Sequence, residues 1–280
     1  MFIVIIHLKS WKNSPPLQAI DIIVTSLAIL RTILIALYIF LIGDILCHES
    51  MIQMDMFPEH IILLTLSVEF CNMWWSSVLC VFYCVKITHS SNRLLTRLKM
   101  NISKMIPWLL LVSVVPSFFS SLPYKWLMFS IHFFNVTNGQ TRVIETNWFN
   151  YFIIRFVASI IPFIIFCFSV GLLIASLLRH TRHMSSSGSG FTEAQRDIHI
   201  SVIRSMIVFL LCYVLYFLAS NLFPVGIIYK RPLLTPLCAI FYVAVPSLHS
   251  FSIIVGNSEL KNAILIILHC SWMRAKSLSR

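Results

Sequence analysis

Charge is scarce in this sequence. Only 11% of the 280 residues are Asp, Glu, Lys or Arg, and only 10 are acidic, whereas about a quarter of the residues of a soluble domain are charged. Hydrophobic residues make up 58% of the chain, and the mean hydropathy is +0.87. This composition excludes an ordinary soluble protein and predicts one that crosses a membrane several times.

Catalytic and metal-binding motifs are also missing. The chain has no HExxH, GxSxG or Walker lysine loop, and its 10 histidines are scattered without Cys/His metal spacing. We therefore expect neither an enzyme nor a bound metal or cofactor. The apolar runs use up nearly the whole length, so a single membrane domain over residues 1–280 is expected.

The sequence contains six long apolar runs. Each reaches the roughly 20 residues that a membrane-crossing helix needs, and none has the alternation of a barrel strand. The predicted spans are residues 17–43, 60–86, 105–127, 151–178, 200–223 and 233–256, followed by a tail over 257–280. A further apolar run at residues 1–8 is too short to cross and is expected to be a cut helix.

Basic residues predict the orientation of these spans. Lys and Arg gather after the second and fourth spans and in the tail, whereas loop 44–59 has four acids and no base. By the positive-inside tendency those basic segments and the C-terminus are cytoplasmic. The net charge of +11 is then an inner-surface charge facing lipid, and no nucleic acid is needed as a partner. Of two glycosylation sequons, Asn135 falls in an outer loop and Asn101 in an inner one, so only Asn135 is expected to carry sugar.

The charges expected inside the spans are Asp21, Arg31 and Glu69. Arg31 lies about 15 Å along its helix from Asp21, so we expect its partners on other helices. Glu69 lies roughly 15 Å below the outer surface and shares a helix face with Asn72 and Met73. Either an outward-facing binding cavity or an internal hydrogen-bond network would explain this face.

Several short sequence motifs indicate a particular family of membrane proteins. The last span reads Pro246-Ser-Leu-His249-Ser250-Phe251, which resembles the PSxHSF signature of type 2 bitter taste receptors. Leu27-Ala-Ile-Leu-Arg31 is similar to the LAxSR of their second helix, and the segment ending in Lys86-Ile87 to the end of their third. The resemblance covers essentially the whole chain, whereas the Asp-Arg-Tyr and NPxxY motifs of rhodopsin-like receptors are absent.

This resemblance implies an all-α membrane protein with a seven-transmembrane helix bundle. Residues 1–8 resemble the inner half of the family's first helix, so six complete spans are expected. The implied function is a plasma-membrane receptor that binds small bitter compounds in an outward-facing pocket and activates a gustducin-like heterotrimeric G protein. Two alternatives stay open: a vomeronasal type 1 pheromone receptor and a cation-coupled transporter, although no internal repeat supports the transporter.

The resemblance also implies roles for individual residues. The expected ligand-binding residues are Glu69, Phe70, Asn72, Met73, Tyr216, Ala239 and Tyr242. The expected activation network contains Arg31, Pro246, Ser247, His249 and Ser250, and the G protein is expected to meet Lys86, Arg93, His180, His199 and Arg204. Glu69 stands where most members have an asparagine, and an anionic side chain there is expected to favour cationic bitter amines.

Overall fold

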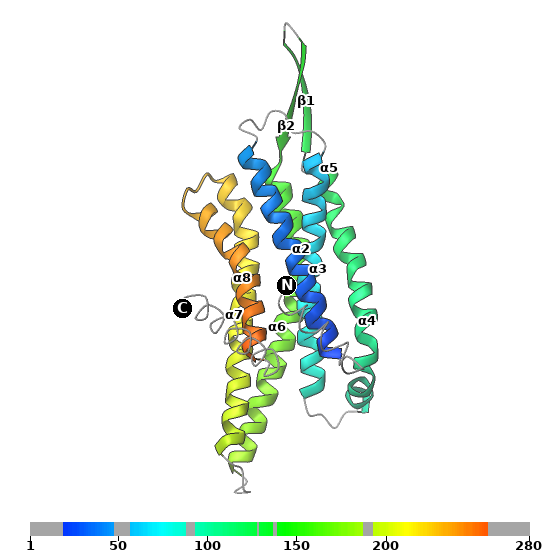
Figure 1. Ribbon diagram of the computed structural model, residues 1–280, viewed down its shortest axis with the longest axis vertical. Coiled ribbons are helices and arrows are strands. Elements are labelled where there is room, and N and C mark those ends of the chain that lie inside the picture. The colour runs from blue at the N-terminus through cyan, green and yellow to red at the C-terminus, as the bar shows by residue number, and fades with distance from the viewer. Residues whose placement is uncertain are drawn as a thin grey trace, which may run out of the picture.

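The computed structural model describes residues 19–47, 57–87, 93–127, 129–136, 139–186 and 193–256. It shows a bundle of long helices with a β-hairpin standing at one end (Figure 1). The helices are α2 (Ala19–Cys47), α3 (Phe57–Ile87), α4 (Arg93–Ser121), α5 (Pro123–Leu127), α6 (Trp148–Ser186), α7 (Glu193–Ile228) and α8 (Leu234–Gly256). The cut helix expected at residues 1–8 and the tail expected at 257–280 lie outside the described residues.

Five segments of the described chain are long and apolar enough to cross a membrane: Ala19–Leu41, His60–Ile87, Thr96–Leu127, Trp148–Arg179 and Ile203–Ile228. Helix α8 adds a shorter apolar segment, Leu234–Val245. These segments correspond to the six predicted spans, so the helical fold class is confirmed. The helices extend further than the spans, and α4 begins at Arg93, 12 residues before the predicted start at 105.

A β-hairpin lies in the outer loop, where the sequence predicts only a connecting segment. Strand β1 (Phe129–Val136) pairs antiparallel with β2 (Gly139–Thr146), from Phe129 opposite Thr146 to Val136 opposite Gly139. Aromatic and β-branched residues are frequent in both strands, and these residue types favour extended backbone. The hairpin joins α5 to α6, so it marks the end of the bundle that we expect to face outward (Figure 1).

Helix α3 lies at the centre of the bundle. It packs against α2, α4 and α6, while α7 packs between α6 and α8, and α2 also contacts α8. Large buried side chains fill the interior, among them Phe70 and Met73 of α3, Phe166 of α6 and Tyr213 of α7. The Phe166 and Tyr213 rings stack with centroids 3.8 Å apart and so join α6 to α7.

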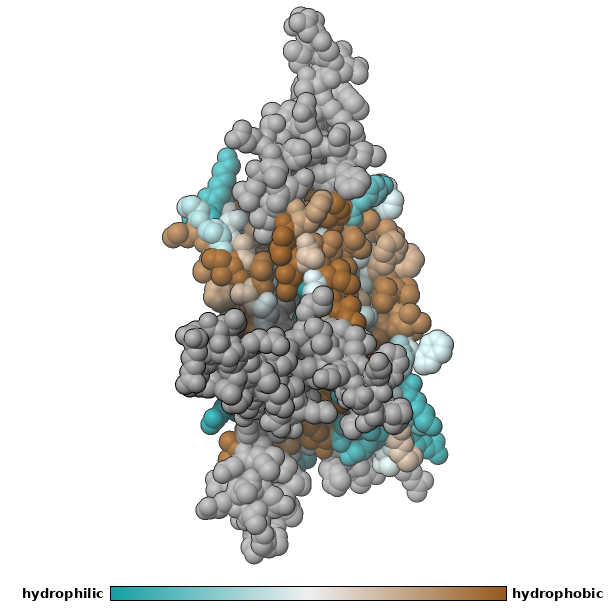
Figure 2. Space-filling model, in the orientation of Figure 1, coloured by the Kyte–Doolittle hydropathy of each residue, from teal (hydrophilic) through white to brown (hydrophobic). Residues whose placement is uncertain are grey.

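Apolar side chains also cover the outside of the bundle. Trp108, Leu111 and Val115 of α4 and Ile164 and Phe168 of α6 are more than half exposed. Figure 2 shows a band of hydrophobic residues with hydrophilic residues near its two ends. Exposed apolar surface on this scale fits a lipid environment, because exposing it to water would be energetically unfavourable.

Candidate functional site

An ion pair lies at the centre of the bundle. Glu69 of α3 and Arg155 of α6 are 0% and 2% exposed, and their side chains form a bidentate pair. Arg155 Nη1 donates to Glu69 Oε2 at 2.9 Å, and Nη2 donates to Oε1. Matched carboxylate and guanidinium geometry of this kind gives strong, charge-assisted hydrogen bonds.

Two tyrosines complete the carboxylate's hydrogen bonds. The Tyr216 hydroxyl of α7 donates to Glu69 Oε1 at 3.0 Å, and the Tyr242 hydroxyl of α8 donates to Oε2. Their rings stack in parallel with centroids 5.7 Å apart. We call Glu69, Arg155, Tyr216 and Tyr242 the polar centre. It joins one residue from each of α3, α6, α7 and α8, so a change at this point reaches four helices.

Aromatic rings enclose the guanidinium as well. Arg155 Cζ lies 5.0 Å from the Tyr242 ring centroid and 5.7 Å from that of Tyr151, and Nη1 also donates to the Tyr151 hydroxyl at 3.0 Å. The Tyr38 ring of α2 lies 5.2 Å from the Tyr242 ring. Cation–π contacts to electron-rich rings partly replace the water that a buried guanidinium has lost.

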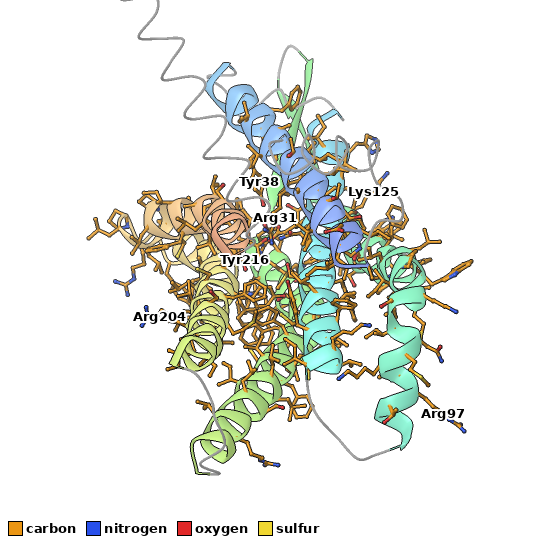
Figure 3. All side chains as sticks on the ribbon, turned by 60° about the horizontal axis from the view of Figure 1, so that its bottom comes forward. Arg31, Tyr38, Arg97, Lys125, Arg204 and Tyr216 are labelled. Atoms are coloured by element: carbon orange, nitrogen blue, oxygen red, sulfur yellow. The ribbon has the colours of Figure 1, made fainter. Side chains whose placement is uncertain are left out.

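A second polar contact lies one helical turn further along α3. Arg31 Nε donates to Asn72 Oδ1 at 3.1 Å, which confirms that Arg31 finds a partner on another helix. Both residues line a cavity of about 20 Å³ together with Ser76, Tyr213 and Tyr216, and Figure 3 labels Arg31 and Tyr216 in the interior of the bundle. A cavity of this size holds a single water molecule and no bitter compound. Tyr216 lines this cavity and also bonds Glu69, so it links the two polar contacts.

Only some of the expected ligand-binding residues contact one another. Glu69, Tyr216 and Tyr242 are in hydrogen-bond contact, whereas Asn72 bonds Arg31 instead. Phe70 and Met73 are 1% exposed and belong to the main core. Ala239 is half-buried, about one turn before Tyr242 on α8.

The other expected residues lie elsewhere in the bundle. Ser247 of α8 and Arg204 of α7 are exposed, and Lys86 is half-buried at the end of α3, with Nζ 6.0 Å from the Phe82 ring centroid. For six residues the backbone lies in a described helix but the side chain is outside the described set: Arg93, His180, His199, Pro246, His249 and Ser250. Asn135 lies in β1, opposite Gln140.

Arg155 is the main omission of the sequence analysis. It lies within the predicted span 151–178 and is 2% exposed, and the expected set of Asp21, Arg31 and Glu69 did not include this buried charge. The presence of Arg155 also changes the electrostatic environment of Glu69. A carboxylate that accepts hydrogen bonds from a guanidinium and two phenols is no longer an isolated negative charge.

The fold and the buried polar centre define a multi-pass helical membrane protein with ionisable groups inside the bundle. A family model described as "Taste receptor protein (TAS2R)" matches residues 1–272. Taste receptor type 2 member 40 of Gallus gallus is 30% identical over 280 residues, covering 95% of this chain and 88% of the relative. Member 119 of Rattus norvegicus is 30% identical, covering 98% of this chain and 84% of the relative, and member 39 of Homo sapiens is 29% identical, covering 94% and 79%.

The chain therefore belongs to the type 2 taste receptor family, whose members are seven-transmembrane, G-protein-coupled bitter taste receptors. This confirms the resemblance seen in the sequence strings. The family is one of receptors and not of enzymes, and its partners are ligands and G proteins in general. The whole-chain match favours this function over the pheromone receptor and the transporter considered above.

Proposed function

We propose that this receptor takes up small bitter molecules from the outer side of the membrane and recognises them next to the polar centre. Arg155 lies seven residues into α6, whose first residue Trp148 adjoins the hairpin, so the polar centre is about 10 Å from the outer end by helix rise. The observation that carries the proposal is the joining of four helices at Glu69. A ligand that alters any of these contacts shifts the packing of α3, α6, α7 and α8 together.

The proposed ligand-binding set contains Glu69, Phe70, Asn72, Met73, Tyr216, Ala239 and Tyr242. Contacts within this set support the proposal, because the hydroxyls of Tyr216 and Tyr242 both donate to the Glu69 carboxylate. Apolar and aromatic walls with a few convergent polar groups are typical of small-molecule sites.

Signals are proposed to leave through the opposite end of the bundle. Lys86, Arg93 and Arg204 come from helix segments on the far side from the hairpin, and Figure 3 shows Arg97 and Arg204 toward that end of the bundle. Basic helix ends on one side support a cytoplasmic face, with a cytoplasmic C-terminus and lipid headgroups nearby. We place contact with a gustducin-like G protein here, including His180 and His199, and assign the protein to the plasma membrane, with no nucleic-acid partner.

The proposed activation network connects these two ends. Arg31 and Asn72 lie between the polar centre and the inner half, and the cavity beside them also contacts Tyr216. Pro246, Ser247, His249 and Ser250 continue along α8 from Tyr242 toward the cytoplasmic face. Helix interiors tolerate proline in membranes when neighbouring helices support the backbone, so Pro246 is a suitable pivot.

Calcium responses test the proposed function. Cells expressing the receptor with a gustducin-type Gα should respond to members of a bitter-compound panel, and cells expressing a Gα with an unrelated C-terminal segment should not. Surface labelling of an epitope tag shows that the receptor is present in both cases. Equal responses with both Gα proteins would contradict the gustducin assignment. Substrate-driven current without any G protein would favour the transporter instead.

A further inference from the structure

The polar centre carries no net formal charge, although sequence reasoning treats Glu69 as an anion awaiting a cation. Both carboxylate oxygens accept hydrogen bonds from Arg155, and each also accepts one from a tyrosine. A cationic ligand would have to displace Arg155 or compete with it at close range. Removing one partner of a buried ion pair is strongly unfavourable, so this exchange opposes binding of a cation.

The Nε–H of Arg155 is used neither by the ion pair nor by the bond to Tyr151. Within the described part of the chain, its Nε–H has no hydrogen-bond partner, although the residue is 98% buried, since its exposed fraction is 2%. Buried polar groups in proteins are nearly always hydrogen-bonded, and a buried donor without an acceptor loses free energy. This donor therefore indicates a position for an acceptor atom beside the ion pair.

A second group of the same kind lies nearby. The Tyr38 hydroxyl is buried and has no hydrogen-bond partner among the described residues. Its ring lies 5.2 Å from that of Tyr242, and Arg155 Cζ lies 5.0 Å from the same Tyr242 ring. Figure 3 shows Tyr38 on α2. The Tyr242 ring therefore lies beside two residues with an unsatisfied donor, Tyr38 of α2 and Arg155 of α6.

We infer that Arg155 and Tyr38 determine the ligand class of this receptor, and that they select uncharged molecules with a hydrogen-bond acceptor oxygen, such as a lactone carbonyl. Arg155 Nε–H donates to that oxygen and the Tyr38 hydroxyl donates to it or to a second one. Cationic amines are disfavoured because Arg155 already neutralises Glu69, and carboxylates are disfavoured because Glu69 lies beside them. This inference rests on the proposed function, since it assumes that ligands bind at the polar centre.

Two variants and a matched control test the inference. Arg155→Lys keeps a cation for Glu69 but removes Nε–H, and Tyr38→Phe removes only the hydroxyl. Thr25→Val is the control, because Thr25 Oγ1 is another buried hydroxyl of α2 without a partner among the described residues, about 20 Å along the helix from Tyr38. All forms are compared at equal surface expression, using uncharged lactones such as coumarin, cationic amines such as quinine and carboxylates such as salicylate.

We expect uncharged lactones to be the class that activates the wild type best. For such an agonist, Arg155→Lys should raise the half-maximal concentration about tenfold or more and Tyr38→Phe about threefold, as expected for lost hydrogen bonds from a charged and a neutral donor. Thr25→Val should leave it unchanged. If Arg155→Lys fails to reach the surface, Tyr38→Phe alone decides.

Other results would contradict either the inference or the proposed function. Activation mainly by cationic amines, or an unchanged response of both variants to the lactones, would overturn the inference while leaving the proposed function in place. No response to any compound from a surface-expressed receptor, in cells where a control receptor responds, would overturn the proposed function itself.

Discussion

Arg155 of α6 holds Glu69 of α3 in a bidentate ion pair, with Nη1 donating to Oε2 at 2.9 Å, and both residues are almost fully buried. The pair lies in an apolar bundle that faces lipid, where a lone charge costs several kcal/mol. Each residue therefore lowers the free-energy cost of burying the charge of the other. This mutual dependence leads to the first prediction.

Glu69→Gln and Arg155→Gln should each destabilise the receptor by about 3–5 kcal/mol, because each leaves one buried charge unpaired. The double variant, with two neutral amides, should lose less than the sum of the two single losses. Thermal unfolding of purified receptor in detergent measures all three forms. Additive losses would show that the two side chains do not depend on each other.

The tyrosines of the polar centre give a second prediction. Tyr216→Phe and Tyr242→Phe each remove one hydrogen bond to the Glu69 carboxylate while keeping the ring stack, and each should cost about 1.5–3 kcal/mol. Tyr229→Phe is the matched control, because Tyr229 is 68% exposed in the turn after α7. The same unfolding measurement applies. A loss at Tyr229 as large as at the other two positions would refute the assigned role.

The contact between Arg31 and Asn72 gives a third prediction. Asn72→Leu keeps the approximate side-chain volume but removes the oxygen that accepts from Arg31 Nε at 3.1 Å. We expect fewer receptors at the cell surface and a melting temperature lowered by several degrees, since a hydrogen bond to a charged group is worth about 1.5–3 kcal/mol. Asn72→Asp, which offers Arg31 a carboxylate, should be affected less. The reverse order would mean that Arg31 does not determine the residue required at position 72.

The sequence predicted the helices well because lipid imposes a simple rule on them: a span must be long, apolar and helical. All six predicted spans contain a described helix. Helix ends were less predictable, since α6 continues to Ser186 and α7 starts at Glu193, where length beyond the apolar run is set by packing. The hairpin was missed because hydropathy over a window as long as a membrane span does not detect strands of 8 residues.

The polar centre was predictable to a lesser degree. Glu69 was conspicuous as an acid in an apolar run, and Arg155 carries the same signal seven residues into α6. Opposite charges in the outer halves of two spans that both enter the membrane from the outside indicate a possible pair. Which tyrosines complete the site depends on how α7 and α8 are rotated, and the sequence alone does not fix that rotation.

Close packing of α7 against α8 gives the last prediction. A Cβ at Gly226 of α7 would lie 2.7 Å from Thr235 Oγ1 and 3.1 Å from Thr235 N, so even an alanine would force Thr235 of α8 to shift. Gly226→Ala should therefore destabilise the receptor by about 1–3 kcal/mol, the usual cost of overpacking. Gly171→Ala on α6 is the control, because its Cβ meets nothing within 4 Å, and it should be neutral or slightly stabilising since alanine favours helix. Thermal unfolding of the two variants side by side measures the difference. The close approach of α7 and α8 would be disproved if both alanine variants melted at the wild-type temperature.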